Sequence, residues 1–174
     1  MSRTQLTENF YLDEFQLSQT AERYSIDMHI EVGGEIHHNI KRLCTQVLQP
    51  VRDELGPVFI SSGYRPLLLN KKIAGSRTSG HMYGLCADFT VAGKTPYEVA
   101  KWLHDNSDRL KRGGLVFDQV IHEFGRWVHA GINAQFEPAR RQSLTAYKAA
   151  PRLPGKRPKT YYANGIHPIH ELTN

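Results

Sequence analysis

The hydrophobic residues between positions 36 and 55 recur at spacings of three and four, which places them on one face of a helix. Pro50 lies inside this pattern, and because proline has no backbone N–H, we expect a kink there or the last turns of the helix. The pattern predicts one long amphipathic helix that packs on the core. Its apolar face consists of Ile36, Ile40, Leu43, Cys44, Val47, Val51 and Leu55.

Four shorter segments carry the apolar, β-branched and aromatic residues that are typical of strands. The second of them contains Asp88, and the last two flank Gly125-Arg126. Two apolar runs around a glycine-containing turn indicate a β-hairpin. The segments are residues 58–65, 85–91, 115–124 and 127–132.

A second helix is predicted from about residue 96 to Asn106. Thr95 can cap its N-terminus, Pro96 occupies the first helical position, and Glu98 lies three residues after the cap, which together make a capping box. No internal repeat accompanies these elements. Helices and strands in this mixture predict an α+β domain.

The length of 174 residues fits one domain, and a hydrophobic content of 40% is ordinary for a soluble protein. A second catalytic domain does not fit in this length. Cys44 and Cys86 are too few for a disulfide framework or a four-cysteine zinc site. Because Cys86 lies between Leu85 and Ala87 in an apolar run, we expect it to be a buried packing residue.

No stretch of the sequence approaches the ~18 apolar residues of a transmembrane helix, and residues 1–8 lack the apolar run of a signal peptide. We therefore expect synthesis in the cytoplasm and no membrane insertion. We also expect a monomer.

The net charge of +5 is concentrated in residues 136–174, which contain seven Lys or Arg residues and two Glu residues. Residues 1–135 contain 15 basic and 15 acidic residues. We expect residues 1–135 to carry the chemistry and residues 136–174 to form a basic extension that wraps or flanks the same domain. Such an extension can bind anionic envelope polymers, or it can simply be solvated. An obligate nucleic-acid partner is not predicted.

The candidate chemistry centres on His81, Asp88 and His129. A loop that leads into a strand can bring His81 and Asp88 together, with Gly84 allowing a close backbone approach. Catalytic zinc is held by three protein groups and keeps a fourth position for water, so two imidazoles and one carboxylate fit such a site. Each residue alone could equally be a hydrogen-bonding residue, but together with Ser79 they form a motif that favours a metal.

Four segments in the same order resemble the zinc D-Ala-D-Ala carboxypeptidases, the M15 peptidases, and in particular their single-domain bacterial and phage members. The resemblance covers roughly residues 5–132. It implies the fold that these enzymes share with the amino-terminal domain of hedgehog proteins, a central antiparallel sheet with flanking helices. It also implies zinc bound by His81, Asp88 and His129. The segments are residues 10–20, 60–66, 79–88 and 118–129.

The resemblance implies that Glu123 is the general base, because it lies six residues before His129, where hedgehog proteins and related peptidases carry an active-site glutamate. Many family members instead have an acidic residue three positions before the last histidine, where this sequence has Arg126. A two-residue hairpin turn would place His122 opposite His129, and a longer loop or a bulge would place Glu123 there. His122 is otherwise a neighbour that tunes the site or a surface residue, and Glu123 can alternatively be an exposed carboxylate.

Arg65 matches the family arginine that faces the substrate near the zinc. Its guanidinium can bind a carboxylate or stabilise an oxyanion, and the alternative is a structural ion pair with Asp88 or Glu123. Ser62 and Tyr64 can serve only to shape the turn, and Trp127 can belong to the core. The residues expected to contact the substrate are Arg65, Ser62, Tyr64 and Trp127.

These features and the resemblance predict a zinc peptidase that hydrolyses peptidoglycan stem or cross-link peptides, as a D-Ala-D-Ala carboxypeptidase or an endopeptidase. The small size and the missing signal peptide fit a phage or prophage endolysin that reaches the cell wall at host lysis. The alternative is a non-catalytic, zinc-stabilised cell-wall-binding or virion module of the same fold. The presence of both Glu123 and Arg65 favours the enzyme.

Overall fold

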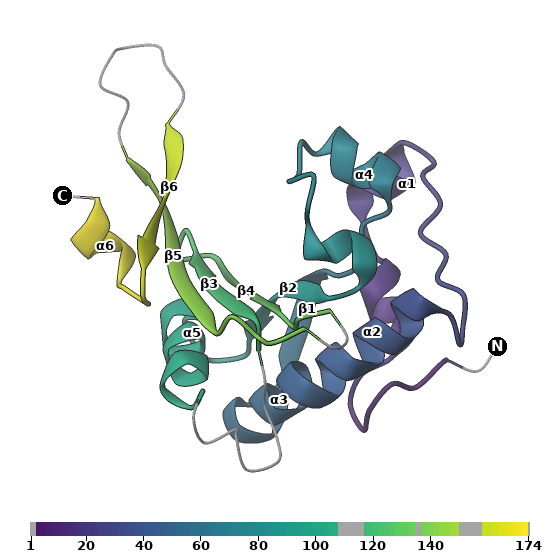
Figure 1. Ribbon diagram of the computed structural model, residues 1–174, viewed down its shortest axis with the longest axis horizontal. Helices are drawn as coiled ribbons and strands as arrows, with labels where there is room; N and C mark the ends of the chain where they lie inside the picture. The colour runs from purple at the N-terminus through teal and green to yellow at the C-terminus, as the bar shows by residue number, and fades with distance from the viewer. Residues whose placement is uncertain (1–2, 108–116, 135–136, 150–157, 174) are drawn as a thin grey trace.

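The computed structural model of the protein describes residues 3–107, 117–134, 137–149 and 158–173. The described residues form an α+β structure around one six-stranded sheet with the order β1-β2-β4-β3-β5-β6 (Figure 1). The predicted α+β class is confirmed. The strands are β1 Val58–Ser62, β2 Cys86–Val91, β3 Gln119–Glu123, β4 Trp127–Gly131, β5 Gln142–Ala149 and β6 Lys159–Asn164.

The described helices flank this sheet, and every one of them is too short or too polar to span a bilayer. Figure 1 shows α2, α3 and α5 along one side of the sheet, whereas α1 and α4 lie near its β1 end. The α-helices are α1 Gln19–Arg23, α2 Glu35–Leu43, α3 Gln49–Leu55, α4 Leu67–Lys72, α5 Pro96–Asp105 and α6 Ile169–Leu172. Short 3-10 helices cover Leu12–Gln16 and Gly80–Tyr83.

The predicted long helix is confirmed as α2 and α3, which are joined by a π-helical turn at Cys44–Leu48. Gln49 N–H donates to the Cys44 carbonyl across this turn, and Pro50 follows in the first turn of α3. Because Pro50 lacks an N–H, the wider turn absorbs the interruption without ending the helix. The fully buried residues of this helix are Ile40, Leu43, Cys44, Val47, Leu48 and Val51.

The second predicted helix is confirmed as α5. Thr95 Oγ1 accepts the Glu98 N–H at 3.2 Å, and the Glu98 side chain in turn accepts the Thr95 N–H at 2.7 Å, so the capping box is complete. Val99, Ala100 and Leu103 are fully buried against the sheet. The core therefore lies between the sheet and a layer made of α2, α3 and α5.

The prediction of an antiparallel sheet is wrong in one place, because β3 and β5 pair in parallel. The other strand pairings of the described residues are antiparallel. β4 ends and β5 begins beside the same end of β3, because Gln119 pairs with both Gly131 and Gln142, so β5 runs in the direction of β3. At this end of β3, Asp118 accepts the Arg140 guanidinium at 2.5 Å and the Arg140 backbone N–H at 2.7 Å.

The β3–β4 hairpin is confirmed, but neither predicted register is correct. Phe124, Gly125 and Arg126 form a three-residue connection in which Phe124 and Gly125 have positive φ and Arg126 N–H donates to the Glu123 carbonyl. Glu123 therefore pairs with Trp127, and Ile121 lies opposite His129. The turn begins at Phe124, one residue before Gly125-Arg126. Relative to a two-residue turn, each β4 residue therefore pairs with the β3 residue one position earlier.

The segment after residue 135 contributes β5 and β6 to the same sheet as the rest of the chain. Among its basic residues, Arg140 pairs with Asp118, and Lys148 lies over the Phe124 ring at 5.3 Å. Arg152, Lys156 and Arg157, which carry much of the predicted basic extension, lie outside the described residues.

Candidate metal centre

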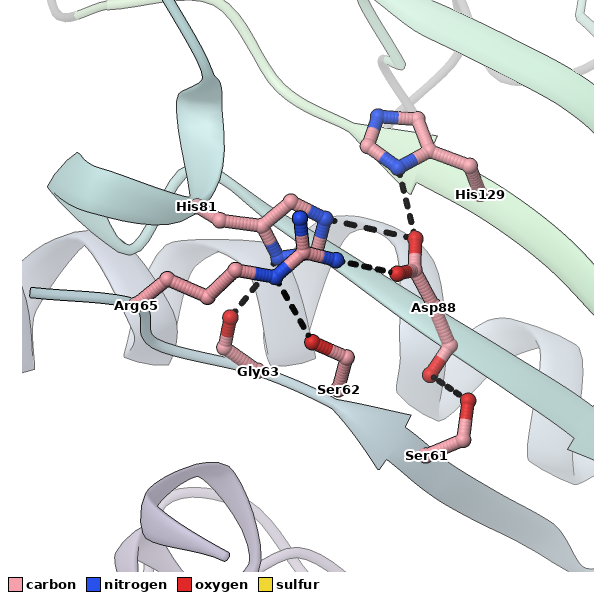
Figure 2. Close-up of polar contacts among 7 residues, drawn as sticks. All are labelled: Ser61, Ser62, Gly63, Arg65, His81, Asp88 and His129. Atoms are coloured by element: carbon pink, nitrogen blue, oxygen red, sulfur yellow. Dashed lines mark hydrogen bonds and ion pairs between the residues drawn. The ribbon is translucent and has the colours of Figure 1, made fainter. Parts of the chain in front are cut away.

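His81 belongs to the 3-10 helix that precedes β2, and its ring orientation is fixed by the backbone. Its Nδ1–H donates to the Gly63 carbonyl at 2.7 Å, since a carbonyl can only accept. This bond leaves Nε2 directed at Asp88, 3.2 Å from Oδ1 (Figure 2). Such a carbonyl partner is the usual way to select the tautomer of a metal-binding histidine.

Two glycines permit the backbone approaches that place His81. A Cβ at Gly63 would lie 2.6 Å from the Phe15 Cα, and one at Gly84 would lie 2.9 Å from the Ile36 carbonyl oxygen. Gly84 also has a φ of +67°, which favours glycine. The predicted role of Gly84 in a close backbone approach is confirmed.

Asp88 and His129 are direct cross-strand partners on β2 and β4. His129 Nδ1 lies 2.7 Å from Asp88 Oδ1, the same oxygen that faces His81, and Arg65 donates to Asp88 Oδ2 at 2.5 Å (Figure 2). Arg65 is positioned in turn by a 2.9 Å bond from its Nε to Ser62 Oγ. The ion pair with Asp88 is the arrangement that the sequence left as the structural alternative for Arg65.

The charges of this cluster are mutually dependent. Burial alone raises the pKa of Asp88, but hydrogen bonds from His129 and His81 hold that pKa well below its usual value. Burial lowers the pKa of both histidines, yet the negative charges of Cys86 and Asp88 raise the pKa of His81 to about 9 and that of His129 well above 6.5. The histidines therefore hold protons next to Asp88 and Cys86, and a cation that binds these groups would release those protons.

The geometry fits a divalent metal. In a tetrahedral zinc site with bonds of about 2.0 Å, ligand atoms lie roughly 3.3 Å apart. The distance of 3.2 Å between His81 Nε2 and Asp88 Oδ1 matches this spacing, and the 2.7 Å contact of His129 Nδ1 with the same oxygen needs a small outward shift. Among the residues that the sequence proposed as ligands, His81 and His129 therefore each direct a ring nitrogen at the same carboxylate oxygen of Asp88.

Cys86 also lies beside His81 and His129, although the sequence indicated only a packing residue. It is buried and free, and its thiol offers a ligand atom within 4.8 Å of those of His81 and His129. Burial raises its pKa, but the charges of His129 and His81 lower it to about 7. The signal that could have found Cys86 is its place two residues before Asp88, because alternate residues of a strand share one face.

Glu123 shares the open face of the sheet with these residues. Its carboxylate lies within 4.8 Å of ligand atoms of Asp88 and His129. Burial and then the charge of Asp88 raise the pKa of Glu123, which the nearby His129, His81 and Arg65 partly offset. A carboxyl with a raised pKa beside a metal site has the properties of a general acid and base.

His122 lies on the opposite face of the sheet, where its ring is 5.8 Å from that of Tyr97 on α5. The side chain is buried, with 2% of its surface exposed, and its Nδ1–H donates to the His167 carbonyl at 2.9 Å. The structure therefore separates His122 from the cluster. It is neither a surface residue nor in contact with the candidate ligands.

His122 gives the fold a dependence on pH. Burial lowers its pKa below 6.5, and its Nε2 has no hydrogen-bond partner among the described residues, so protonation would bury an unsatisfied N–H. Between 6.5 and the lowered pKa, the unfolded chain binds more protons, so the free energy of unfolding falls as the pH drops through this window. Urea denaturation of chelator-treated protein measures the free energy of unfolding at about pH 7.5 and about pH 5.5. Between these two pH values, this free energy should fall less for His122→Gln than for wild type. Equal losses in both proteins would assign the acid sensitivity to other groups.

A cavity of about 1140 Å³ opens over this face of the sheet. Arg65 and Trp127 line it together with the candidate ligands and Glu123, as a substrate-binding role requires. Ser62 instead supports Arg65, and Tyr64 packs against the hydrophobic core. The cavity also takes residues from β5 and β6, including Leu144 and Tyr162, which the sequence placed in an extension without chemistry.

Comparison with known proteins gave one family match. A family model described as Peptidase M15 matches residues 8–129. The chain belongs to the M15 peptidase family. M15 peptidases are generally zinc-dependent, and membership makes this chain a peptidase of the metallopeptidase type. The match to the M15 model ends at His129, so it contains all three candidate ligands and Glu123. No match was found among curated proteins.

Proposed function

We propose that the protein is a zinc-dependent peptidase of the hedgehog/DD-peptidase fold that hydrolyses amide bonds in peptidoglycan stem or cross-link peptides. The observation that carries the proposal is the convergence of His81 Nε2, Asp88 Oδ1 and His129 Nδ1 beside Glu123, at a cavity of peptide size in a chain of the M15 family. These residues would hold the zinc ion. When bound, zinc activates water and polarises the scissile carbonyl.

The residues around the candidate metal site have separate roles in the proposed reaction. Glu123 takes the proton of the attacking water and delivers it to the leaving amine, which its raised pKa favours. Arg65 holds Asp88 in place through Oδ2 and brings positive charge to the negative charge that develops on the scissile carbonyl oxygen. Gly63 keeps the Nε2 lone pair of His81 directed at the site.

The substrate class follows from the resemblance to single-domain bacterial and phage enzymes, and the open cavity can accept a branched or cross-linked peptide. We propose a phage or prophage endolysin that acts on the cell wall after host lysis. Attraction of anionic envelope polymers to the basic residues of 136–174 would add affinity for the wall.

Cys86 favours a second candidate, a non-catalytic zinc-stabilised module. If its thiolate joined His81, Asp88 and His129, the metal would have four protein ligands, as in structural zinc sites. Such a protein would bind cell walls without cleaving them. The presence of Glu123 within reach of the cluster supports the enzyme.

Incubation with purified peptidoglycan distinguishes the two candidates. We expect new peptide termini, identified by mass spectrometry, and a fall in turbidity if a cross-link is opened. A zinc chelator should abolish product formation, and added zinc should restore it. Mass spectrometry is essential because removal of a terminal D-Ala leaves turbidity unchanged. Co-sedimentation with the wall in the absence of any product would support the non-catalytic module instead.

A further inference from the structure

Strand pairing places Glu123 in a row of four side chains on the open face of the sheet. Glu123 pairs with Trp127 on β4 and with Ala146 on β5, and Ala146 pairs with Tyr162 on β6. Directly paired residues point to the same face of a sheet. The row therefore runs Trp127, Glu123, Ala146, Tyr162, and only the methyl group of Ala146 stands between Glu123 and Tyr162 in it.

Tyr162 lines the same cavity as Glu123. Because neighbouring strands lie ~4.8 Å apart, the backbones of Glu123 and Tyr162 are separated by roughly 10 Å, and the fully buried Ala146 lies between them. With 58% of its surface exposed, Tyr162 can contact a molecule in the cavity without moving the core. Burial and then the charge of Glu123 raise the pKa of Tyr162, so its hydroxyl remains a hydrogen-bond donor.

The order of the strands indicates which part of a bound peptide, on one side of the scissile bond or the other, lies near Tyr162. The candidate ligands lie on β2, on β4 and in the 3-10 helix before β2. Glu123 lies on β3, and Tyr162 lies on the far side of Glu123, on β6. Under the proposed function, Glu123 delivers a proton to the leaving amine. The part of the peptide that extends past Glu123, away from the metal, is therefore the leaving part.

We propose that Tyr162 binds the leaving part of the substrate peptide, with its hydroxyl donating a hydrogen bond to a carbonyl or carboxylate oxygen of that part. This inference rests on the proposed function. It assigns a specificity-determining contact to a residue beyond the segment 8–129 that matches the family model. Tyr162 thereby selects substrates whose leaving part extends past the first residue.

Tyr161 provides a matched control because it is the neighbouring tyrosine on the opposite face. Its ring stacks on Tyr147 at a centroid distance of 5.8 Å, and it does not line the cavity. Tyr162→Phe and Tyr161→Phe each remove one hydroxyl from β6. The probe is a soluble muramidase digest of peptidoglycan, from which mass spectrometry selects the peptide that wild type cleaves and a version with a shortened leaving part.

We expect Tyr162→Phe to lower kcat/KM for the long peptide by about 3- to 10-fold, mainly through KM, the size of one neutral hydrogen bond. The shortened peptide and Tyr161→Phe should show little change. In a Glu123→Ala background, in which turnover is slow, calorimetry should show that Tyr162→Phe weakens binding of the long peptide to the same extent. The thermal unfolding midpoint and the zinc content should stay at the wild-type values.

The possible outcomes separate this inference from the function on which it rests. Unchanged KM and unchanged binding in Tyr162→Phe, with an active wild type, would overturn the role of Tyr162 and leave the peptidase intact. If Tyr162→Phe and Tyr161→Phe lower kcat/KM equally and also lower the unfolding midpoint, the effect would come from a less stable β5–β6 hairpin. That result would also overturn the role of Tyr162. A wild type that cleaves no peptide in the digest would overturn the proposed function and this inference together.

Discussion

Glu123→Ala is expected to slow peptide hydrolysis by a factor of at least ~100, the lower range for loss of general acid and base catalysis, while one zinc ion stays bound. The reason is that Glu123 lies within 4.8 Å of Asp88 and His129 but contributes no contact on which the positions of His81 or Asp88 depend. Steady-state kinetics on the cleaved muropeptide and metal analysis of the same preparation test both halves of the expectation. Glu123→Gln should slow hydrolysis similarly, since the glutamine side chain has nearly the same shape but cannot accept and donate the proton.

His122→Gln is the matched control for this result. His122 is adjacent in sequence, but it lies on the opposite face of the sheet and contacts the His167 carbonyl and Tyr97. Its replacement should lower stability without a comparable loss of rate. Near-normal turnover by Glu123→Ala, with the fold shown intact, would remove Glu123 from the mechanism and require another group to move the proton.

His81→Ala and His129→Ala should each reduce the bound zinc from about one equivalent to a small fraction of it, with affinity reduced by well over the ~100-fold that loss of an outer-shell partner can cause. Each substitution removes a nitrogen that lies within 3.2 Å of Asp88 Oδ1 and leaves the carboxylate with one imidazole fewer. Equilibrium dialysis against a zinc buffer measures the affinity directly. Peptide cleavage should disappear with the metal.

His104→Ala controls for the general loss of an imidazole, because His104 is exposed on α5 and its ring bonds to Ser143 Oγ, away from the candidate ligands. It should keep wild-type zinc affinity. Full zinc occupancy in both His81→Ala and His129→Ala would place the metal elsewhere. Retention in only one of them would identify Cys86 as a substitute ligand, which Cys86→Ala in the same background would then remove.

The features that the sequence predicted correctly depend on local patterns. The long helix follows from the spacing of its apolar residues, and α5 follows from Thr95, Pro96 and Glu98, because each pattern is complete within a few turns. The proximity of His81, Asp88 and His129 was predictable from the motif, and the structure brings their ligand atoms to 2.7–3.2 Å contacts.

The features that the sequence missed depend on contacts between distant segments or on one residue of register. The parallel pairing of β3 and β5 joins segments about twenty residues apart, and no local periodicity records it. The hairpin register changed because the turn begins at Phe124 rather than Gly125. Tyr162 reaches the cavity only through two successive strand pairings, so no pattern near residue 162 could have associated it with Glu123.

The parallel pairing of β3 and β5 has a consequence for how such chains can vary. The family match ends within β4, so a chain reduced to the matched segment would retain β3 with one row of backbone N–H and C=O groups unpaired. An exposed strand edge of this kind recruits other chains and promotes aggregation. A relative that lacks β5 and β6 therefore needs another segment to cover the exposed edge of β3. Because β5 and β6 also form a wall of the cavity, a different covering segment can alter substrate preference while the metal ligands stay constant.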